Sequence, residues 1–204
     1  MGSGKITRTL LCPVINRKIK ISALLTCGLC CIITLVIFME NNLHNRKHPR
    51  LDYYDYSTVG AYFITICTQD RRCLLSRIVG RGLAPAEIQY TAYGQIAREQ
   101  SLLLEQRYPS LKVERYVIMP NHIHMILVLE ETMDVTRRPT IMDIVCAYKS
   151  LTTRQCKKVQ PIDKLFQTSF YEHVIRGFED YNEIAEYIVN NPNQWEIDRL
   201  YSKK

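Results

Sequence analysis

The sequence lacks the features that indicate a repetitive, disordered or disulfide-stabilised protein. It contains no internal repeat and no low-complexity tract, and 47% of its 204 residues are hydrophobic whereas 23% are charged. These values favour one globular domain with a substantial core plus an additional segment. Eight cysteines are present, but they are scattered, and the close set Cys27, Cys30 and Cys31 has no second pair and lies in an apolar run. The cysteines therefore favour a reducing compartment over a disulfide framework or a redox or zinc motif.

Acidic residues are absent before Glu40, whereas five basic residues occur there. Without those five, the chain has 22 basic and 20 acidic residues, so most of its formal charge of +7 belongs to the N-terminal segment. The remainder is only mildly basic. Net charge alone therefore does not indicate a DNA-binding or RNA-binding protein.

Charge is also absent from residues 21–39, which form a run of 19 mostly apolar positions. As a helix this run would span roughly 28 Å, which is typical of a transmembrane segment. No clear cleavage site follows it, which disfavours a signal peptide. We interpret residues 1–39 as a basic segment with an N-terminal hydrophobic helix. It is either a membrane anchor or upstream sequence included by a mis-assigned start, with Met39 as the initiator. The second alternative, which we favour, predicts a cytoplasmic protein; the first predicts a membrane-anchored one.

Residues 40–50 are polar and basic and are interpreted as a linker; residues 51–204 are predicted to form the compact domain. Within it the pattern predicts a strand, a helix, two strands, a helix, a strand and a last helix. This order favours an α+β domain with a ferredoxin-like antiparallel sheet and flanking helices. The expected ranges are strands at 61–68, 111–118, 122–129 and 165–175, weaker extended segments at 73–79 and 86–90, and helices from 91 to 106, from 140 onward and at 179–191.

Two histidines open the strand at 122–129, directly after a turn at Pro120-Asn121. Because side chains alternate along a strand, His122 and His124 face the same side, about 6.5 to 7 Å apart. Two imidazoles in this arrangement can hold one metal ion. The alternative is a pair of polar residues at the exposed mouth of a strand.

The last helix, which ends before Pro192, carries Tyr187 and Asn191 one turn apart on one face. A helical tyrosine alone is most often a packing residue. Combined with a divalent ion held by two histidines and an amide oxygen, however, a tyrosine can attack a phosphodiester and form a covalent phosphotyrosine. Tyrosine has a pKa of about 10, so this nucleophile needs a base or the field of a metal ion to lose its proton.

Several short motifs in register resemble those of the REP-associated tyrosine transposases, which belong to the single-tyrosine HUH transposases of insertion sequences. The resemblance covers about residues 48–196. Phe166-Gln167 departs from the usual Trp-Gln of the family, and the hydrophobic N-terminus is foreign to it. The motifs are Asp55-Tyr56-Ser57, the strand at 61–69, the segment at 117–124, Tyr148-Lys149-Ser150, the segment at 170–176 and the segment at 186–192.

The resemblance implies a transposase that binds single-stranded DNA with a hairpin or palindromic repeats. Such an enzyme cleaves and rejoins the DNA through a 5′-phosphotyrosine with Mg²⁺ or Mn²⁺. His122 and His124 match the metal-binding pair, Asn191 matches the polar residue that helps hold the metal, and Tyr187 matches the nucleophile. A homodimer is an assembly that we also consider.

The basic residues Lys149, Arg154 and Arg176 are candidates for DNA contacts, against the alternative of a solvated surface. Tyr171 and Tyr181 are the competing nucleophiles, and we expect His173 to be a structural histidine that makes hydrogen bonds.

Two other functions are also compatible with the sequence. One is a regulator that binds hairpin nucleic acid without catalysis; the intact set of two histidines, tyrosine and asparagine argues against it. The other is a membrane-anchored protein that uses the histidine pair for different metal chemistry.

Overall fold

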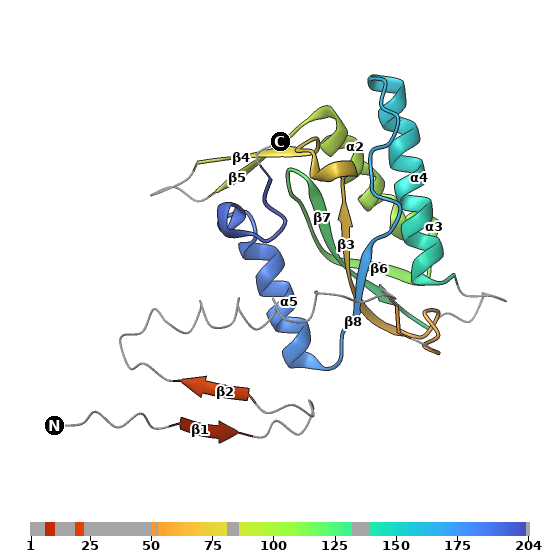
Figure 1. Ribbon diagram of the computed structural model, residues 1–204. Helices are drawn as coiled ribbons and strands as arrows, with labels where there is room; N and C mark the ends of the chain where they lie inside the picture. Colours follow the sequence, from red (N-terminus) through yellow and green to blue (C-terminus); the bar gives the residue numbers. More distant parts are fainter. Residues whose placement is uncertain are drawn as a thin grey trace. The chain divides into compact units, whose positions relative to one another are not determined.

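The strand that carries the two histidines is one of the two central strands of a four-stranded sheet. In the computed structural model, the strands are β6 (Leu111–Ile118), β7 (His122–Leu129), β3 (Gly60–Cys67) and β8 (Tyr171–Val174). They lie in the order β6-β7-β3-β8, and every neighbouring pair is antiparallel. The prediction of an α+β domain with an antiparallel sheet and helices is thus confirmed (Figure 1).

The structure describes residues 7–10, 19–22, 50–51, 53–80, 86–131 and 139–202. The chain divides into two units, Met1–His48 and Pro49–Lys204. In the first unit, β1 (Thr7–Leu10) pairs antiparallel with β2 (Ile19–Ser22). The predicted hydrophobic helix was to begin at Ile21, which lies in β2; its residues 23–39 fall outside the described part of the chain. Within the described ranges, none of the helices has both the length and the apolar character that a bilayer crossing requires.

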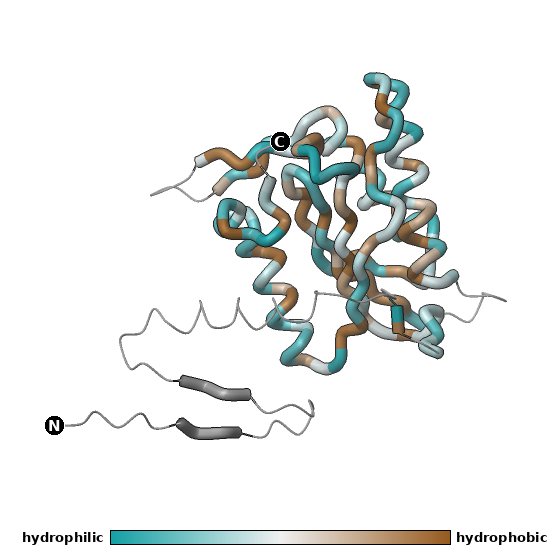
Figure 2. The backbone as a smooth tube through the Cα atoms, viewed as in Figure 1, coloured by the Kyte–Doolittle hydropathy of each residue, from teal (hydrophilic) through white to brown (hydrophobic). Residues whose placement is uncertain are grey.

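Helices cover both faces of the sheet. The helices α2 (Ala92–Leu102) and α4 (Ile141–Val159) pack on one face, together with Ile64 of β3 and Met125 of β7. The helix α5 (Phe178–Asn190) packs on the other, where Ile184 and Ile188 meet Ile126. Figure 1 shows α5 and α4 on opposite sides of the sheet, and Figure 2 shows the hydrophobic residues concentrated along the strands and the helix faces against them.

The alternation of side chains along β7 decides where the histidines lie. Ile123, Met125 and Leu127 belong to the core beneath α2 and α4. Ile126 belongs to the core beneath α5, and since His122 and His124 have the same parity as Ile126, they face α5 as well. The apolar residues between the histidines therefore fix both rings on the α5 side of the sheet.

Local signals in the sequence explain where the long helices begin. The hydroxyl of Thr91 accepts a hydrogen bond from the Gly94 amide at the start of α2. Thr140 and Asp143 form a reciprocal capping box at the start of α4. The predicted helix up to Gln106 is interrupted at Leu103, so that α2 is followed by a separate short helix, α3 (Leu104–Arg107).

Four further short elements are described in the second unit. The weaker extended segments form a separate hairpin of β4 (Ser76–Val79) and β5 (Glu87–Tyr90). The one-turn helices η1 (Gln69–Arg71) and η2 (Trp195–Ile197) follow β3 and α5. The strand predicted at 165–175 is too long, because only β8 pairs continuously with β3, and Phe166 forms an isolated bridge with Thr68.

Candidate active site

The two histidines lie side by side beneath α5, and both are almost fully buried. The ring centroids of His122 and His124 are 4.5 Å apart, and the two residues are 0% and 2% exposed. The ring of Trp195 lies beside His122, and that of Phe63 stacks on His124. Burial excludes the alternative of two polar residues at a solvent-exposed strand mouth.

Hydrogen bonds at the Nδ1 atoms orient both imidazoles. Asn121 Nδ2 donates to two backbone carbonyls, those of Arg71 and Leu200, so its Oδ1 is free to accept. His122 Nδ1 lies 2.8 Å from that Oδ1 and must carry the proton. His122 Nε2 therefore presents a lone pair. His124 Nδ1 lies 2.8 Å from Thr65 Oγ1, its direct neighbour on β3.

Tyr187 of α5 reaches this pair within a single chain. Its hydroxyl lies 3.3 Å from His124 Nε2 and also donates to Asp198 Oδ2 at 3.2 Å. The phenol ring packs edge-on against both Phe63 and His124. The strand with the histidines and the helix with the tyrosine thus approach closely enough for one phosphate group to contact both.

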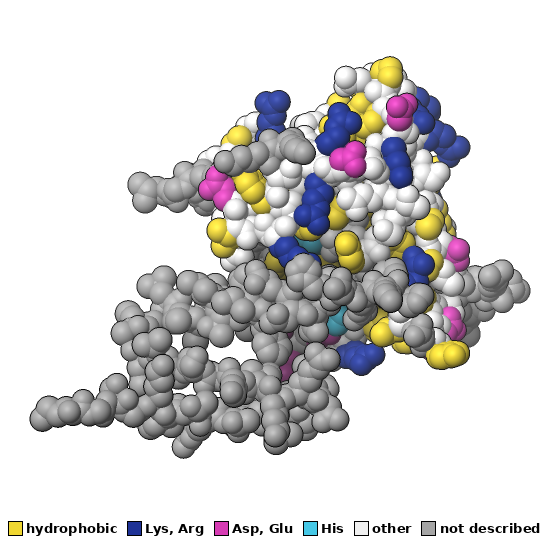
Figure 3. All heavy atoms as spheres, viewed as in Figure 1, with side chains coloured by type: hydrophobic (Ala, Val, Ile, Leu, Met, Phe, Trp, Pro, Cys, Tyr) yellow, Lys and Arg dark blue, Asp and Glu magenta, His cyan; other side chains and the backbone are white. Residues whose placement is uncertain are grey.

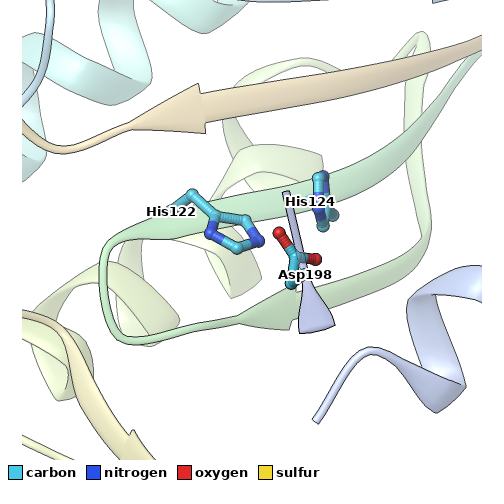
Figure 4. A group of neighbouring side chains, drawn as sticks. All are labelled: His122, His124 and Asp198. Atoms are coloured by element: carbon cyan, nitrogen blue, oxygen red, sulfur yellow. The ribbon is translucent and has the colours of Figure 1, made fainter. Parts of the chain in front are cut away.

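Asn191 and Asp198 close the site on the side of α5. Asn191 follows the last residue of α5 and is 1% exposed. Its Nδ2 donates to Asp198 Oδ2 at 2.6 Å, which leaves Oδ1 as the free acceptor. Figure 4 shows the Asp198 carboxylate directed toward the two imidazoles. One candidate ligand atom from each of His122, His124 and Asp198 lies within 4.8 Å of the other two.

Two buried atoms indicate that a cation fits here. Among the described residues, His122 Nε2 and Asn191 Oδ1 are buried and neither has a hydrogen-bond partner. Both present lone pairs, and burying such groups without a partner is costly. Ligands on opposite sides of a small divalent ion are separated by about 4 Å, and the candidate ligand atoms of His122, His124 and Asp198 lie within 4.8 Å of one another. A divalent ion held by these nitrogen and oxygen atoms would satisfy both orphan atoms.

Burial also sets the ionisation of the site. Desolvation lowers the pKa of His122, an effect that the charge of Asp198 partly offsets, and desolvation together with the neighbouring ring lowers that of His124. Both imidazoles are therefore neutral, the form that binds metals. Desolvation and then the negative charge of Asp198 raise the pKa of Tyr187, which keeps this phenol protonated in the metal-free protein.

The other predicted site residues lie elsewhere in the domain. Lys149 and Arg154 lie on α4, which covers the opposite face of the sheet. The Lys149 ammonium donates to the carbonyl of Thr168 at 2.7 Å, whereas Arg154 is exposed. Arg176 is exposed in the turn between β8 and α5. Figure 3 shows Lys and Arg side chains gathered around the carboxyl end of α4, where Lys157 and Lys158 form the last turn.

The remaining candidates have other partners. His173 Nε2 pairs with Asp180 at 2.9 Å, so the expectation of a hydrogen-bonded structural histidine is confirmed. Tyr171 is 43% exposed on the edge strand β8, and the hydroxyl of Tyr181 contacts Glu114. Of the three tyrosines considered, Tyr187 is the one that contacts the histidine pair.

Sequence reasoning missed Asp198. This residue lies seven positions after Asn191, beyond the stretch that resembles the transposase family, and in no regular helix or strand. The sequence feature that could have identified it is a carboxylate that closely follows the helix with the proposed nucleophile and amide ligand.

We expect replacement of Thr65 by valine to weaken Mn²⁺ binding by about 10- to 100-fold, because the His124 ring loses the hydrogen bond that orients it. Valine keeps the shape of the threonine side chain. Isothermal titration with Mn²⁺ measures the effect. Thr153→Val on α4 removes a hydroxyl that bonds only within its own helix and serves as the control. Equal affinities for the two variants would contradict this role for Thr65.

We expect the metal-free protein to lose stability as the pH falls below about 6.5, the ordinary pKa of histidine. The pKa values of His122 and His124 are lowered in the folded protein, so the unfolded chain binds protons that the folded chain does not. The free energy of unfolding then falls by up to about 1.4 kcal/mol per pH unit for each ring. Urea unfolding in EDTA at pH 7.5 and 5.5 measures this loss; His173→Gln should show the same loss, and an unchanged stability would contradict the account.

No family model matches this chain. Two solved structures are similar: a REP-associated tyrosine transposase bound to a REP hairpin, and a Deinococcus radiodurans protein provisionally described as a transposase. The first is 23% identical, covers 70% of this chain and 73% of its own, and has a TM-score of 0.47. The second is 18% identical, covers 69% and 95%, and has a TM-score of 0.38. Likenesses at this level carry no conclusion about this chain.

A sequence relative is closer. An uncharacterized protein of Haemophilus influenzae is 33% identical over 175 residues, which cover 78% of this chain and 94% of the relative. At this identity and coverage, the chain belongs to the same protein family as that Haemophilus influenzae protein.

Proposed function

We propose that this protein is a metal-dependent tyrosine transposase that binds hairpin-bearing single-stranded DNA and cleaves and rejoins it through a 5′-phosphotyrosine. One observation carries the proposal. The Tyr187 hydroxyl lies 3.3 Å from His124 Nε2, beside two buried lone-pair atoms, His122 Nε2 and Asn191 Oδ1, that lack partners among the described residues. A hydroxyl nucleophile beside a set of potential metal ligands is typical of a site that cleaves phosphodiesters. A tyrosine that only packs in the core needs no such ligands beside it.

The fold gives this proposal a suitable scaffold. Apart from the β4-β5 hairpin, the short helices and the final helix α5, the order is β3-α2-β6-β7-α4-β8, and with the sheet order β6-β7-β3-β8 it fits a ferredoxin-like domain. The histidines lie on a central strand, and Tyr187 lies on a helix packed against the same face, so the groups are held by rigid elements. All of them come from one chain, so the chemistry does not require a partner subunit, and a homodimer stays a prediction.

His122, His124 and Asn191 would hold Mg²⁺ or Mn²⁺ through two imidazole nitrogens and an amide oxygen. When bound, the ion would polarise the scissile phosphate and stabilise the charge that develops on it. Asn121 and Thr65 keep the two imidazoles in orientation. The rings of Phe63 and Trp195 border the histidines and limit the access of water to them.

Tyr187 would act as the nucleophile. Its Oη forms a bond to phosphorus while the bond from phosphorus to the 3′ oxygen breaks. The tyrosine loses its proton, and the departing strand takes up a proton to end in a 3′-hydroxyl. The downstream strand stays attached to Tyr187 by its 5′ phosphate. Because the phosphodiester energy is conserved, a 3′-hydroxyl can attack this linkage and rejoin the DNA without ATP.

DNA contacts are proposed for the exposed Arg154 and Arg176 and for Lys149. The ammonium of Lys149 already contacts a backbone carbonyl, so its contribution is expected to be the smallest of the three. Such contacts would be to phosphates and would weaken with salt. Because the proposed substrate is DNA, we expect the protein to act in the cytoplasm.

The test uses the full chain and labelled single strands that carry inverted repeats found beside the gene. A label on the 3′ end should move with the protein in a denaturing gel, and a label on the 5′ end should be released. Both results should require Mn²⁺ or Mg²⁺ and disappear with EDTA or with a strand that cannot form the hairpin. Hairpin binding without cleavage under all these conditions would contradict the transposase proposal and support the non-catalytic regulator.

A further inference from the structure

Asp198 is the acidic group of the site, and its position differs from that of the other site residues. It follows the one-turn helix η2 and lies in an irregular segment near the C-terminus. Its Oδ2 accepts hydrogen bonds from Asn191 Nδ2 at 2.6 Å and from the Tyr187 hydroxyl at 3.2 Å. Its Oδ1 accepts one from the Leu200 amide at 2.6 Å. A carboxylate has about four acceptor positions, so one is left for another partner.

The segment around Asp198 is attached to the histidine hairpin by its own contacts. Trp195 is buried beside the His122 ring, and the ring of Tyr201 packs edge-on against Trp195. The Leu200 carbonyl accepts a hydrogen bond from Asn121 Nδ2 at 2.7 Å, and Asn121 is the same residue that orients His122. The carboxylate is therefore held in place from both sides and does not depend on Tyr187 or Asn191 for its position.

The other candidate ligands supply no charge. His122 and His124 are neutral imidazoles and Asn191 is a neutral amide, whereas Mg²⁺ and Mn²⁺ prefer sites that include carboxylate oxygens. Within the described residues, Asp198 is the carboxylate whose oxygen lies within 4.8 Å of both histidines. Among the described residues, the buried atoms His122 Nε2 and Asn191 Oδ1 lack a geometric hydrogen-bond partner, which is a second indication that a cation belongs at this position.

Asp198 also determines which end of the Asn191 amide is available. A carboxylate accepts hydrogen bonds only, so its contact with Asn191 must be made by Nδ2. That contact leaves Oδ1 as the free atom of the amide. Without Asp198 the amide could rotate and present Nδ2 to the ion, which repels a cation.

We propose that Asp198 is a fourth, carboxylate ligand of the metal ion and the positioning residue that aims the Asn191 amide oxygen and the Tyr187 hydroxyl at the same site. This inference rests on the metal-dependent function proposed above. It assigns to the C-terminal segment a direct part in building the metal site.

Mn²⁺ titration of the full chain, followed by the spin-resonance signal of free Mn²⁺, tests the inference without relying on activity. Asp198→Asn keeps the size of the side chain but removes the charge, and should weaken binding at least tenfold. Asp198→Glu keeps the charge and should bind more tightly than Asp198→Asn. The control is Asp180→Asn, which removes an aspartate that pairs with His173 outside the site and should bind like the wild type.

The outcomes separate this inference from the proposed function. If the wild type does not bind Mn²⁺, the metal-dependent function fails. If the wild type binds and Asp198→Asn binds equally well with an unchanged melting temperature, only the role of Asp198 is overturned.

A second measurement avoids variants altogether and covers the case in which Asp198→Asn fails to fold. Fe²⁺ substituted for Mn²⁺, with peroxide and ascorbate, generates radicals that cut the backbone near the bound ion. We expect cuts around residues 122–124 and around residue 198. Cuts at the histidines alone would contradict the inference.

Discussion

Replacing Tyr187 with phenylalanine is expected to abolish the covalent protein–DNA adduct and to lower strand cleavage by roughly 10³-fold or more, the scale of losing a covalent nucleophile. Phenylalanine keeps the ring that packs against Phe63 and His124. It removes only the hydroxyl that lies 3.3 Å from His124 Nε2. The measurement is the yield of 3′-labelled DNA attached to the protein in a denaturing gel.

Tyr181→Phe is the matched control for this variant. Tyr181 lies on the same helix, but its hydroxyl contacts Glu114 rather than the histidines. This variant should form the adduct at the yield of the wild type. Equal yields for Tyr187→Phe and Tyr181→Phe would refute the assigned nucleophile, and loss in Tyr181→Phe alone would transfer the role to that residue.

Replacing His122 with alanine is expected to weaken Mn²⁺ binding by more than roughly 100-fold, because a direct ligand is lost rather than an outer hydrogen bond. Cleavage should fall together with the metal affinity. The variant also lacks one of the two buried rings whose pKa is lowered by desolvation. The metal-free variant should therefore lose less stability on acidification than the metal-free wild type does.

His173→Ala provides the comparison for this variant. His173 is exposed and pairs with Asp180, so its loss should leave Mn²⁺ affinity unchanged. Isothermal titration measures both variants in parallel. Undiminished Mn²⁺ binding in His122→Ala would contradict the assignment of this residue as a ligand.

The sequence predicted the parts of the site that obey strong local rules. The strand bounds at 111–118 and 122–129 agree with β6 and β7, because a short turn between two apolar runs sets both ends. The common face of His122 and His124 follows from the period of two along a strand. The spacing of Tyr187 and Asn191 follows in the same way from the helix that carries them.

Other features depend on tertiary contacts and did not follow from local patterns. The predicted strand at 165–175 contains many β-forming residues, but its first half forms an isolated bridge, between Phe166 and Thr68 just past the end of β3, and no continuous ladder. Asp198 lies in an irregular segment, and its position depends on Trp195, Leu200 and Asn121, which are brought together by folding. No periodicity in the sequence marks such a residue.

The placement of the basic residues also required the structure. Lys149 and Arg154 share a helix with a continuous apolar stripe, and only the packing of α4 shows that this helix covers the sheet face opposite the histidines. If these residues bind DNA, the DNA must extend around the domain from the proposed cleavage site.

Mass-spectrometric mapping of the covalent adduct would identify the residue that attacks a phosphate held at the proposed metal site of His122 and His124. The full chain is incubated with hairpin-bearing single-stranded DNA and Mn²⁺, then digested with nuclease and trypsin. We expect a nucleotide joined through its 5′ phosphate to Tyr187, in the peptide that spans residues 177–199. No such nucleotide should be found when EDTA replaces Mn²⁺. A nucleotide on Tyr181 or Tyr171, or cleavage that leaves no nucleotide on any tyrosine, would contradict this expectation.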